Sequence, residues 1–242
     1  MPAVRLSSKS IPREERLIMA LDLPTQAAAL RLVEQLGPSV HFYKIGLELF
    51  MSGDYFPLLD ELKSRGKRVF CDLKFFDVPE TVARAVRSLS ERGADFATVH
   101  GNDTMLEAAA REKGSLKILA VTLLTSLDRS DLAALGFQCD VEELVLARAR
   151  KALTLGCDGV ISSGLEAPRL RDSLGEQFLI VTPGIRPVDN RPDDDQKRVV
   201  DVAAAFRNGA DYIVVGRPIR DAADPRAAAL AMQATIAALF PA

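Results

Sequence analysis

Charged side chains end three apolar segments in the first third of the chain, at Asp22, at Lys44 and at the pair Asp72 and Lys74. Because side chains alternate along a strand, Asp72 and Lys74 point the same way and Leu73 between them points the opposite way. A fixed ammonium group beside a reacting atom can stabilise developing negative charge and also carry a proton. Two unit charges about 4 Å apart interact by roughly 1 kcal/mol in water and by about 4 kcal/mol at an effective dielectric constant near 20. These groups therefore matter chemically only where the fold encloses them.

The elements that must position these groups alternate along the chain. Short segments rich in β-branched or aromatic residues are followed by longer Ala/Leu/Arg segments with helical periodicity, which is typical of successive βα units on a parallel sheet. The sequence predicts strands at Leu17 to Asp22, Val40 to Ile45, Arg68 to Lys74, Asp95 to His100, Lys117 to Leu123, Gly159 to Ser162, Phe178 to Thr182 and Tyr212 to Val215.

Predicted helices lie between the strands and share a termination signal. Gly66, Gly93, Gly156 and Gly209 stand where a helix ends, and glycine readily adopts the left-handed conformation that ends helices. The clearest predicted helices are Ala27 to Leu36, Pro79 to Arg92, Glu142 to Leu155, Asp201 to Asn208 and Pro225 to Leu239.

Eight βα units in 242 residues fit a closed barrel better than a doubly wound sheet, and no GxGxxG follows the first strand. We therefore predict the α/β class with a (β/α)8 TIM barrel as a single domain over residues 1–242, residues 1–16 forming a short N-terminal extension. The polar segment Pro187 to Asp195 is predicted to be a mobile βα loop rather than a domain boundary.

Composition narrows the function classes. A formal charge of −2 argues against general nucleic-acid binding and favours a small-molecule partner. The cysteines Cys71, Cys139 and Cys157 are far apart and odd in number, which predicts neither a disulfide framework nor a zinc cluster. No segment approaches the roughly 18 consecutive apolar residues of a membrane helix, and no signal peptide is apparent. A cytoplasmic protein with no membrane partner is expected.

The charged motif of the third strand continues beyond Lys74 as Asp72-Leu73-Lys74-Phe75-Phe76-Asp77. This Asp-x-Lys-x-x-Asp pattern resembles the orotidine 5'-phosphate decarboxylase family. The resemblance extends in the family's order across nearly the whole chain, through Ala20-Leu21-Asp22, Lys44-Ile45-Gly46, Val121-Thr122-Leu123-Leu124-Thr125-Ser126, Val181-Thr182-Pro183-Gly184-Ile185-Arg186 and Val214-Val215-Gly216-Arg217-Pro218. The length is similar to that of the monofunctional bacterial form.

The resemblance implies decarboxylation of orotidine 5'-monophosphate to UMP and CO2 in pyrimidine biosynthesis, without a metal or a cofactor. It implies a catalytic network of Lys44, Asp72, Lys74 and Asp77, in which Lys74 protonates C6 and Asp77 comes from the partner subunit of a homodimer. The remaining roles that it implies are phosphate binding by Arg217, Gly216, Arg186 and Gln196, ribose binding by Asp22 and the partner's Thr81, and pyrimidine binding by Thr125 and Ser126. Lys44 is also implied to bind the substrate.

Other interpretations remain open at this point. Asp77 is also placed to cap the helix that begins near Pro79, and His100 is interpreted as structural or as lying at the edge of the site. The run Asp193 to Asp195 is interpreted as solvated carboxylates rather than a cation site. Cys71 is expected between the barrel and its helices.

Two rival functions also remain. One is a magnesium-dependent sugar-phosphate decarboxylase or aldolase on the same barrel. The other is a catalytically silent nucleotide-binding scaffold that keeps the phosphate site.

Overall fold

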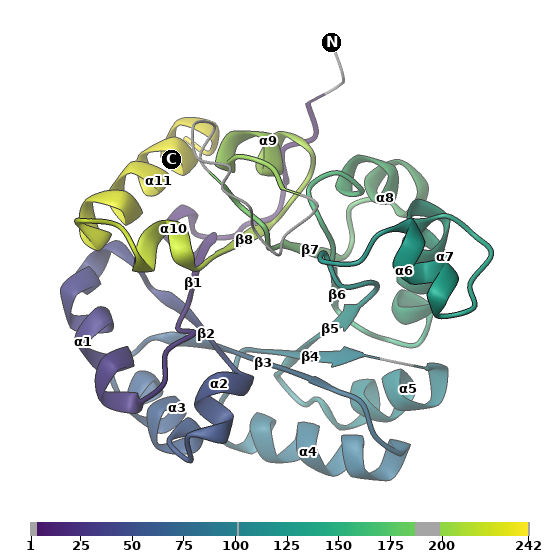
Figure 1. Cartoon of the computed structure of the whole chain (residues 1–242), viewed down its shortest axis with the longest axis horizontal. Helices are drawn as coiled ribbons and strands as arrows, with labels where there is room; N and C mark the ends of the chain where they lie inside the picture. The colour runs from purple at the N-terminus through teal and green to yellow at the C-terminus, as the bar shows by residue number, and fades with distance from the viewer. Residues whose placement is uncertain (1–3, 101, 187–198, 242) are drawn as a thin grey trace.

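The computed structural model describes residues 4–100, 102–186 and 199–241. Its core is a closed barrel of eight parallel strands in chain order, with helices around the outside (Figure 1). The (β/α)8 prediction is confirmed. The strands are β1 (Leu17–Ala20), β2 (Phe42–Gly46), β3 (Arg68–Phe75), β4 (Phe96–His100), β5 (Lys117–Val121), β6 (Gly159–Ile161), β7 (Leu179–Thr182) and β8 (Tyr212–Val215).

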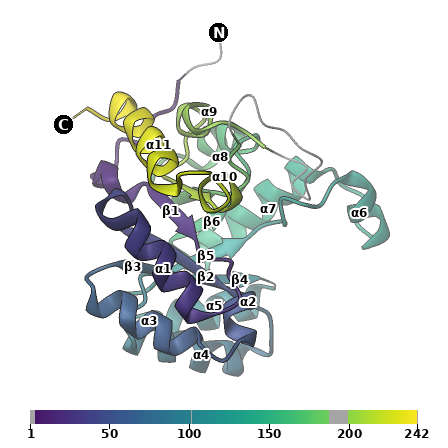
Figure 2. The ribbon, with the colours of Figure 1, turned by 60° about the vertical axis from the view of Figure 1, so that its left-hand side comes forward.

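Four of the longer helices correspond to predicted ones, namely α1 (Gln26–Leu36), α4 (Pro79–Glu91), α7 (Val141–Thr154) and α11 (Pro225–Leu239). Three more were not predicted individually, namely α3 (Tyr55–Ser64), α5 (Asp103–Glu112) and α8 (Ala167–Leu174). Shorter helices lie at α2 (Leu47–Met51), α6 (Arg129–Ala134), α9 (Val202–Arg207) and α10 (Arg217–Arg220), with 3-10 turns η1 (Arg13–Glu15) and η2 (Gly37–Ser39). Figure 2 shows α6 projecting from the side of the barrel. None of the helices in the described part of the chain is long and apolar enough to cross a membrane.

The glycine signals at helix ends are confirmed. Gly66, Gly93, Gly156 and Gly209 all have positive φ, between 69° and 106°. An L side chain is strained in this conformation, and glycine adopts it without a steric penalty. These glycines let the chain leave a helix and turn at once into the next strand.

Two apolar layers hold the barrel. Side chains on the outward face of the strands pack against the helices, and Cys71 lies fully buried in this layer, as expected. The inward face is filled by a smaller cluster, in which Phe42 and Phe96 meet edge to face with ring centroids 4.9 Å apart. The members of this inner cluster are Ile18, Ala20, Phe42, Phe70, Phe96, Leu119, Val181, Tyr212 and Val214. The barrel is thus a packed core that supports functional groups at its rim rather than a pore.

The N-terminal residues predicted as an extension are tied to the barrel. The guanidinium group of Arg5 donates to Asp172 at 2.8 and 2.9 Å. Ser7 and Lys9 donate at 2.5 and 3.1 Å to the carboxylate of Asp211, which is fully buried just before β8. The segment is therefore integrated with the amino-terminal end of the strands, opposite the rim that carries the charged motif.

Candidate active site

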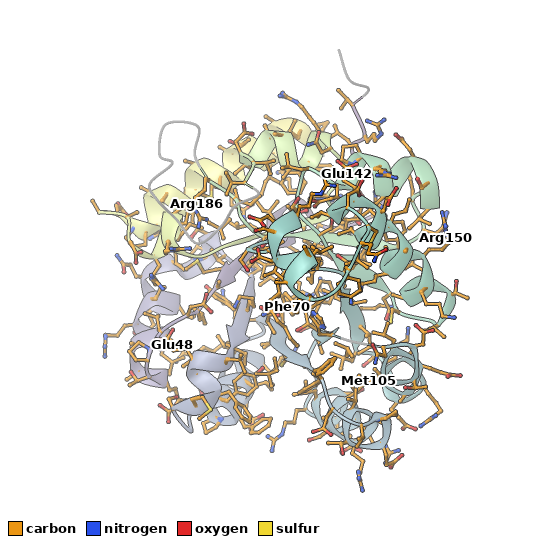
Figure 3. The ribbon with its side chains drawn as sticks, turned by 45° about the vertical axis from the view of Figure 1, so that its right-hand side comes forward. Glu48, Phe70, Met105, Glu142, Arg150 and Arg186 are labelled. Atoms are coloured by element: carbon orange, nitrogen blue, oxygen red, sulfur yellow. The ribbon has the colours of Figure 1, made fainter. Side chains whose placement is uncertain are left out.

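The carboxyl ends of the strands surround a cavity of about 410 Å³. This volume is in the range of small-molecule sites. Phe70 of the inner cluster lies at its base, and Figure 3 shows Phe70 among the strands in the middle of the barrel, with Arg186 on the side of the C-terminal elements. The polar residues of the lining are Asp22, Lys44, Asp72, Lys74, Thr125, Ser126, Arg186, Arg217 and Arg220, with Gly184 and Gly216 between them.

Four charged groups, on β2, on β3 and just after β1, form a row of alternating sign. The ammonium group of Lys44 lies 2.9 Å from Asp22 and 3.5 Å from Asp72. The ammonium group of Lys74 lies 3.0 Å from the same Asp72 oxygen that faces Lys44. Asp72 therefore stands between two cations, and it shares one face with Lys74 as the alternation along the strand predicted.

Burial and neighbouring charges act in opposite directions on the pKa values of Lys44 and Asp72. Burial alone would lower the pKa of Lys44, but the charges of Asp72 and Asp22 outweigh it and the pKa is raised. Burial would likewise raise the pKa of Asp72, but Lys44 and Lys74, with hydrogen bonds from Lys74 and Thr98, hold it below its usual value. Both groups therefore stay charged at neutral pH despite having little contact with water.

Gly46 leaves room for this row. A Cβ at this position would lie 3.2 Å from the Lys44 ammonium nitrogen and 3.5 Å from Asp22. A larger residue at this position would press on the Lys44–Asp22 ion pair, so glycine gives the pair room where β2 passes into α2.

Arginines and hydroxyl groups occupy the rest of the rim. Arg186 follows β7, and Gly216 and Arg217 follow β8 directly, while buried Thr125 and half-buried Ser126 follow β5. The guanidinium group of an arginine can bind a phosphate through two parallel hydrogen bonds. The cavity thus pairs an ion network on β1 to β3 with cationic groups on β7 and β8.

Two predicted site residues lie outside the cavity of their own chain. Asp77 and Thr81 are exposed on the loop after β3 and on the first turn of α4, and they do not line the cavity. Gln196 and the predicted mobile loop Pro187 to Asp195, with the aspartates at its end, lie outside the described residues.

The capping interpretation of Asp77 is wrong. The N-cap of α4 is Val78, which makes no side-chain capping bond. The carboxylate of Asp77 accepts instead from the N–H of Val78 at 2.6 Å. Asp77, the last aspartate of the motif, therefore does not cap α4, and its side chain lies exposed on the loop.

His100 lies beside the site. Its ring meets the ring of Phe76 edge to face, with centroids 5.8 Å apart, and it does not line the cavity. Burial and the nearby charges of Arg148 and Lys74 lower its pKa, so the imidazole is neutral at pH 7. This position is compatible with both interpretations of His100, as a structural residue and as a residue at the edge of the site.

Two polar residues near the network were not predicted. Thr98 on β4 donates a hydrogen bond of 2.9 Å to Asp72. Arg220 lines the cavity and donates at 2.8 Å to the backbone carbonyl of Asp22. A signal existed for Thr98, because it is the polar residue two positions after the inward-facing Phe96 on an otherwise apolar strand.

The described side chains form no metal-binding cluster. In the described ranges, no group of three or more His, Cys, Asp or Glu side chains is arranged to hold a metal ion. The carboxylates of the cavity, Asp22 and Asp72, are each engaged by lysine ammonium groups.

Known proteins resemble this chain along nearly its full length. The model of the orotidine 5'-phosphate decarboxylase / HUMPS family matches residues 15–232. An orotidine 5'-phosphate decarboxylase of Methylococcus capsulatus is 70% identical, covering 98% of both chains, and one of Stenotrophomonas maltophilia is 53% identical, covering 95% of both. Among solved structures, an orotidine 5'-phosphate decarboxylase from Lactobacillus acidophilus superposes with a TM-score of 0.81 at 35% identity, over 92% of this chain and 99% of that one.

Proposed function

The chain belongs to the orotidine 5'-phosphate decarboxylase / HUMPS family, and from this premise we propose that it converts orotidine 5'-monophosphate to UMP and CO2. It is then a carboxy-lyase of pyrimidine biosynthesis. The observation that carries the proposal is the position of Asp72 between the ammonium groups of Lys44 and Lys74 at the base of the cavity. Relatives with the same activity in their names match almost the whole chain, which favours this substrate over a sugar phosphate.

The proposed chemical step needs positive charge beside C6 of the substrate and a proton delivered to that same atom. When the bond between C6 and the carboxylate breaks, its electron pair stays on C6 and CO2 leaves. The resulting carbanion has no adjacent electron sink, so fixed positive charge beside it lowers the barrier. The ammonium group of Lys74 supplies that charge and transfers a proton to C6, and the amine then regains a proton from water. The step as proposed uses no metal and no cofactor.

The substrate's charges suit the two halves of the cavity. We assign its phosphate to Arg186, Gly216 and Arg217, with Gln196, and its pyrimidine to Thr125 and Ser126 at β5. Asp22 and Lys44 bind the ribose. Binding energy at the remote phosphate can then be expressed in the transition state, so that loss of Arg217 reduces turnover as well as affinity.

We further infer a homodimer with shared sites. Asp77 and Thr81 lie outside the cavity of their own chain, and the loop that carries Asp77 also exposes the apolar side chains of Phe76 and Val78. A second subunit packed on this loop would cover these apolar side chains and receive both polar residues. Asp77 then joins the partner's network, and Thr81 binds the partner's ribose.

The test is an ultraviolet assay with orotidine 5'-monophosphate, with and without excess EDTA. Full turnover with EDTA is expected. A loss of activity that magnesium restores would support the metal-dependent rival, and tight UMP binding without any absorbance change would support the silent scaffold.

Lys74→Ala provides the second arm of the test. The variant should fold, because Lys74 lies at the open end of the barrel, and it should lose detectable decarboxylation. Circular dichroism confirms the fold of the variant, and near-normal turnover would refute the assignment of Lys74.

A further inference from the structure

Thr98 lies behind the ion network and contacts two of its members. Its side chain is fully buried on β4. The hydroxyl group donates to one oxygen of Asp72 at 2.9 Å and accepts the backbone N–H of Lys74 at 2.9 Å. One buried hydroxyl thus bonds the carboxylate of one site residue and the main chain of another.

The main chain of Lys74 is unusual. Lys74 has φ of +49°, and among the described residues no other non-glycine residue has a positive φ. Holding a residue with a side chain in this region costs on the order of 1–3 kcal/mol and requires support from its surroundings. The pairing of β3 with β4 shifts register between Cys71 and Phe75, so this stretch lacks the regular ladder. The bond to Thr98 supplies a partner for the Lys74 N–H within that irregular stretch.

The irregular backbone decides where the Lys74 ammonium group lies. A strand bulge redirects a side chain relative to a regular strand. Here the redirected side chain reaches Asp72 at 3.0 Å, on the oxygen that also faces Lys44. The second Asp72 oxygen is held by Thr98, which fixes the orientation of the carboxylate.

We propose that Thr98 is a positioning residue for the decarboxylation, holding the carboxylate of Asp72 and the main chain of Lys74 so that the Lys74 ammonium group points at C6. The inference rests on the proposed function. It assigns to Thr98 no contact with the substrate, because Thr98 does not line the cavity.

Two substitutions separate the hydroxyl from the shape of the side chain. Thr98→Val keeps the volume and removes both the donor and the acceptor, whereas Thr98→Ser keeps the hydroxyl and removes a methyl group. Because a displacement of about 1 Å at a reacting group can lower a rate by roughly a hundredfold, we expect Thr98→Val to lower kcat by about tenfold to a hundredfold. We expect KM to change by less than about threefold, and Thr98→Ser to keep kcat within about threefold of the parent.

Thr122→Val is the matched control. Thr122 follows β5, is almost fully buried, and donates one hydrogen bond of 2.9 Å to the carbonyl of Ile161. The control therefore also removes a buried hydroxyl, but one that has no contact with Asp72 or Lys74. Urea unfolding should show a comparable loss of stability for Thr122→Val and Thr98→Val, while Thr122→Val keeps kcat within about twofold.

Proton exchange at C6 supplies a readout that a purely structural role would not change. An enzyme that delivers a proton to C6 must also catalyse the reverse removal, so UMP in deuterated water should exchange its C6 hydrogen. Proton NMR should show this exchange slowed by Thr98→Val in proportion to kcat, with the UMP dissociation constant unchanged within about threefold.

The outcomes distinguish the two proposals. If the parent protein does not turn over orotidine 5'-monophosphate, the proposed function fails. If the parent is active and Thr98→Val is equally active, or if Thr98→Ser loses as much as Thr98→Val, the role of Thr98 is overturned. Should Thr98→Val fail to fold, Thr98→Ala replaces it, with the same expected values.

Discussion

Asp72 shows how a buried charge is held in its ionised form. Moving a carboxylate out of water costs desolvation free energy, and burying lysine ammonium groups beside it adds their own desolvation cost. Three contacts of the Asp72 carboxylate offset this free energy: the ammonium groups of Lys44 at 3.5 Å and Lys74 at 3.0 Å, and the hydroxyl of Thr98 at 2.9 Å. The two lysines and Thr98 together therefore stabilise the ionised form of Asp72.

Lys44→Met tests this dependence through pH. The lowered pKa of Asp72 means that its stabilising contribution is present above the ordinary carboxylate pKa and is lost as the pH falls through the lowered value. Without Lys44, burial raises the pKa of Asp72, so the acid limb of the pH profile of kcat/KM should move to higher pH. At neutral pH we expect kcat/KM to fall by at least about a hundredfold, equivalent to roughly 3 kcal/mol.

The control for this prediction is Lys63→Met. Lys63 forms a comparable ion pair of 2.8 Å with Asp95, before β4 at the other end of the barrel. Its pH profile should overlay that of the parent. An unchanged acid limb in Lys44→Met would contradict the coupling between Lys44 and Asp72.

Sequence reasoning reached the charged residues of the site but not the groups that support them. Asp22, Lys44, Asp72 and Lys74 end apolar strands, and the carboxyl ends of barrel strands meet at one rim, so their convergence follows from the pattern alone. The contact of Thr98 with the Lys74 N–H could not be predicted, because it depends on an irregular strand. Strict alternation correctly predicts that the side chains of Asp72 and Lys74 share one face, but it does not predict the positive φ of Lys74.

At the scale of elements, the N-terminal segment depends on one buried carboxylate. Asp211 accepts hydrogen bonds from Ser7, Lys9, the guanidinium group of Arg171 at 2.7 Å and the N–H of Ile180 at 2.8 Å. Arg171 is itself almost fully buried. The carboxylate of Asp211 thereby connects the N-terminal segment, α8 and the starts of β7 and β8.

Asp211→Ala should therefore destabilise the fold strongly. The substitution leaves the buried Arg171 cation without its carboxylate, and breaking a buried pair in this way costs about 3–5 kcal/mol. The control is Asp172→Ala, which removes the partner of Arg5, a carboxylate whose side chain is 60% exposed, and should cost less than about 1 kcal/mol. Urea unfolding at pH 7 measures both, and equal losses would show that Asp211 is no special junction.

Some elements followed from the sequence and others did not. The predicted helix at Pro225 to Leu239 has the same bounds as α11, because its apolar periodicity faces the barrel. The short helix α2 escaped prediction because it has only five residues, of which Leu49 alone is buried, while Leu47 and Met51 are exposed. The short helix α6 begins with a capping box between Asp128 and Asp131, a signal that was present in the sequence.

At the scale of the whole molecule, exposed apolar side chains gather on elements that follow neighbouring strands. Leu47 and Met51 on α2 follow β2, and Phe76 and Val78 follow β3, which is paired with β2. Both elements therefore leave the barrel at the rim that carries the cavity. A stable interface buries roughly 800 Å² on each partner, and large apolar side chains at its centre dominate its energy. This rim is the part of the described surface where we place the second subunit.

Mixing two inactive variants tests the shared site. In a mixed dimer of Lys74→Ala and Asp77→Ala chains, one barrel combines both substitutions and the other combines an intact Lys74 with an intact Asp77 from its partner. Random exchange of subunits makes about half of the dimers mixed, so activity should recover to about a quarter of the parent's value per chain. Each variant alone should stay inactive, and exchange should be verified with a mass-tagged chain. If exchange is complete and no activity returns, Asp77 does not act across the interface, and its exposed carboxylate requires another explanation.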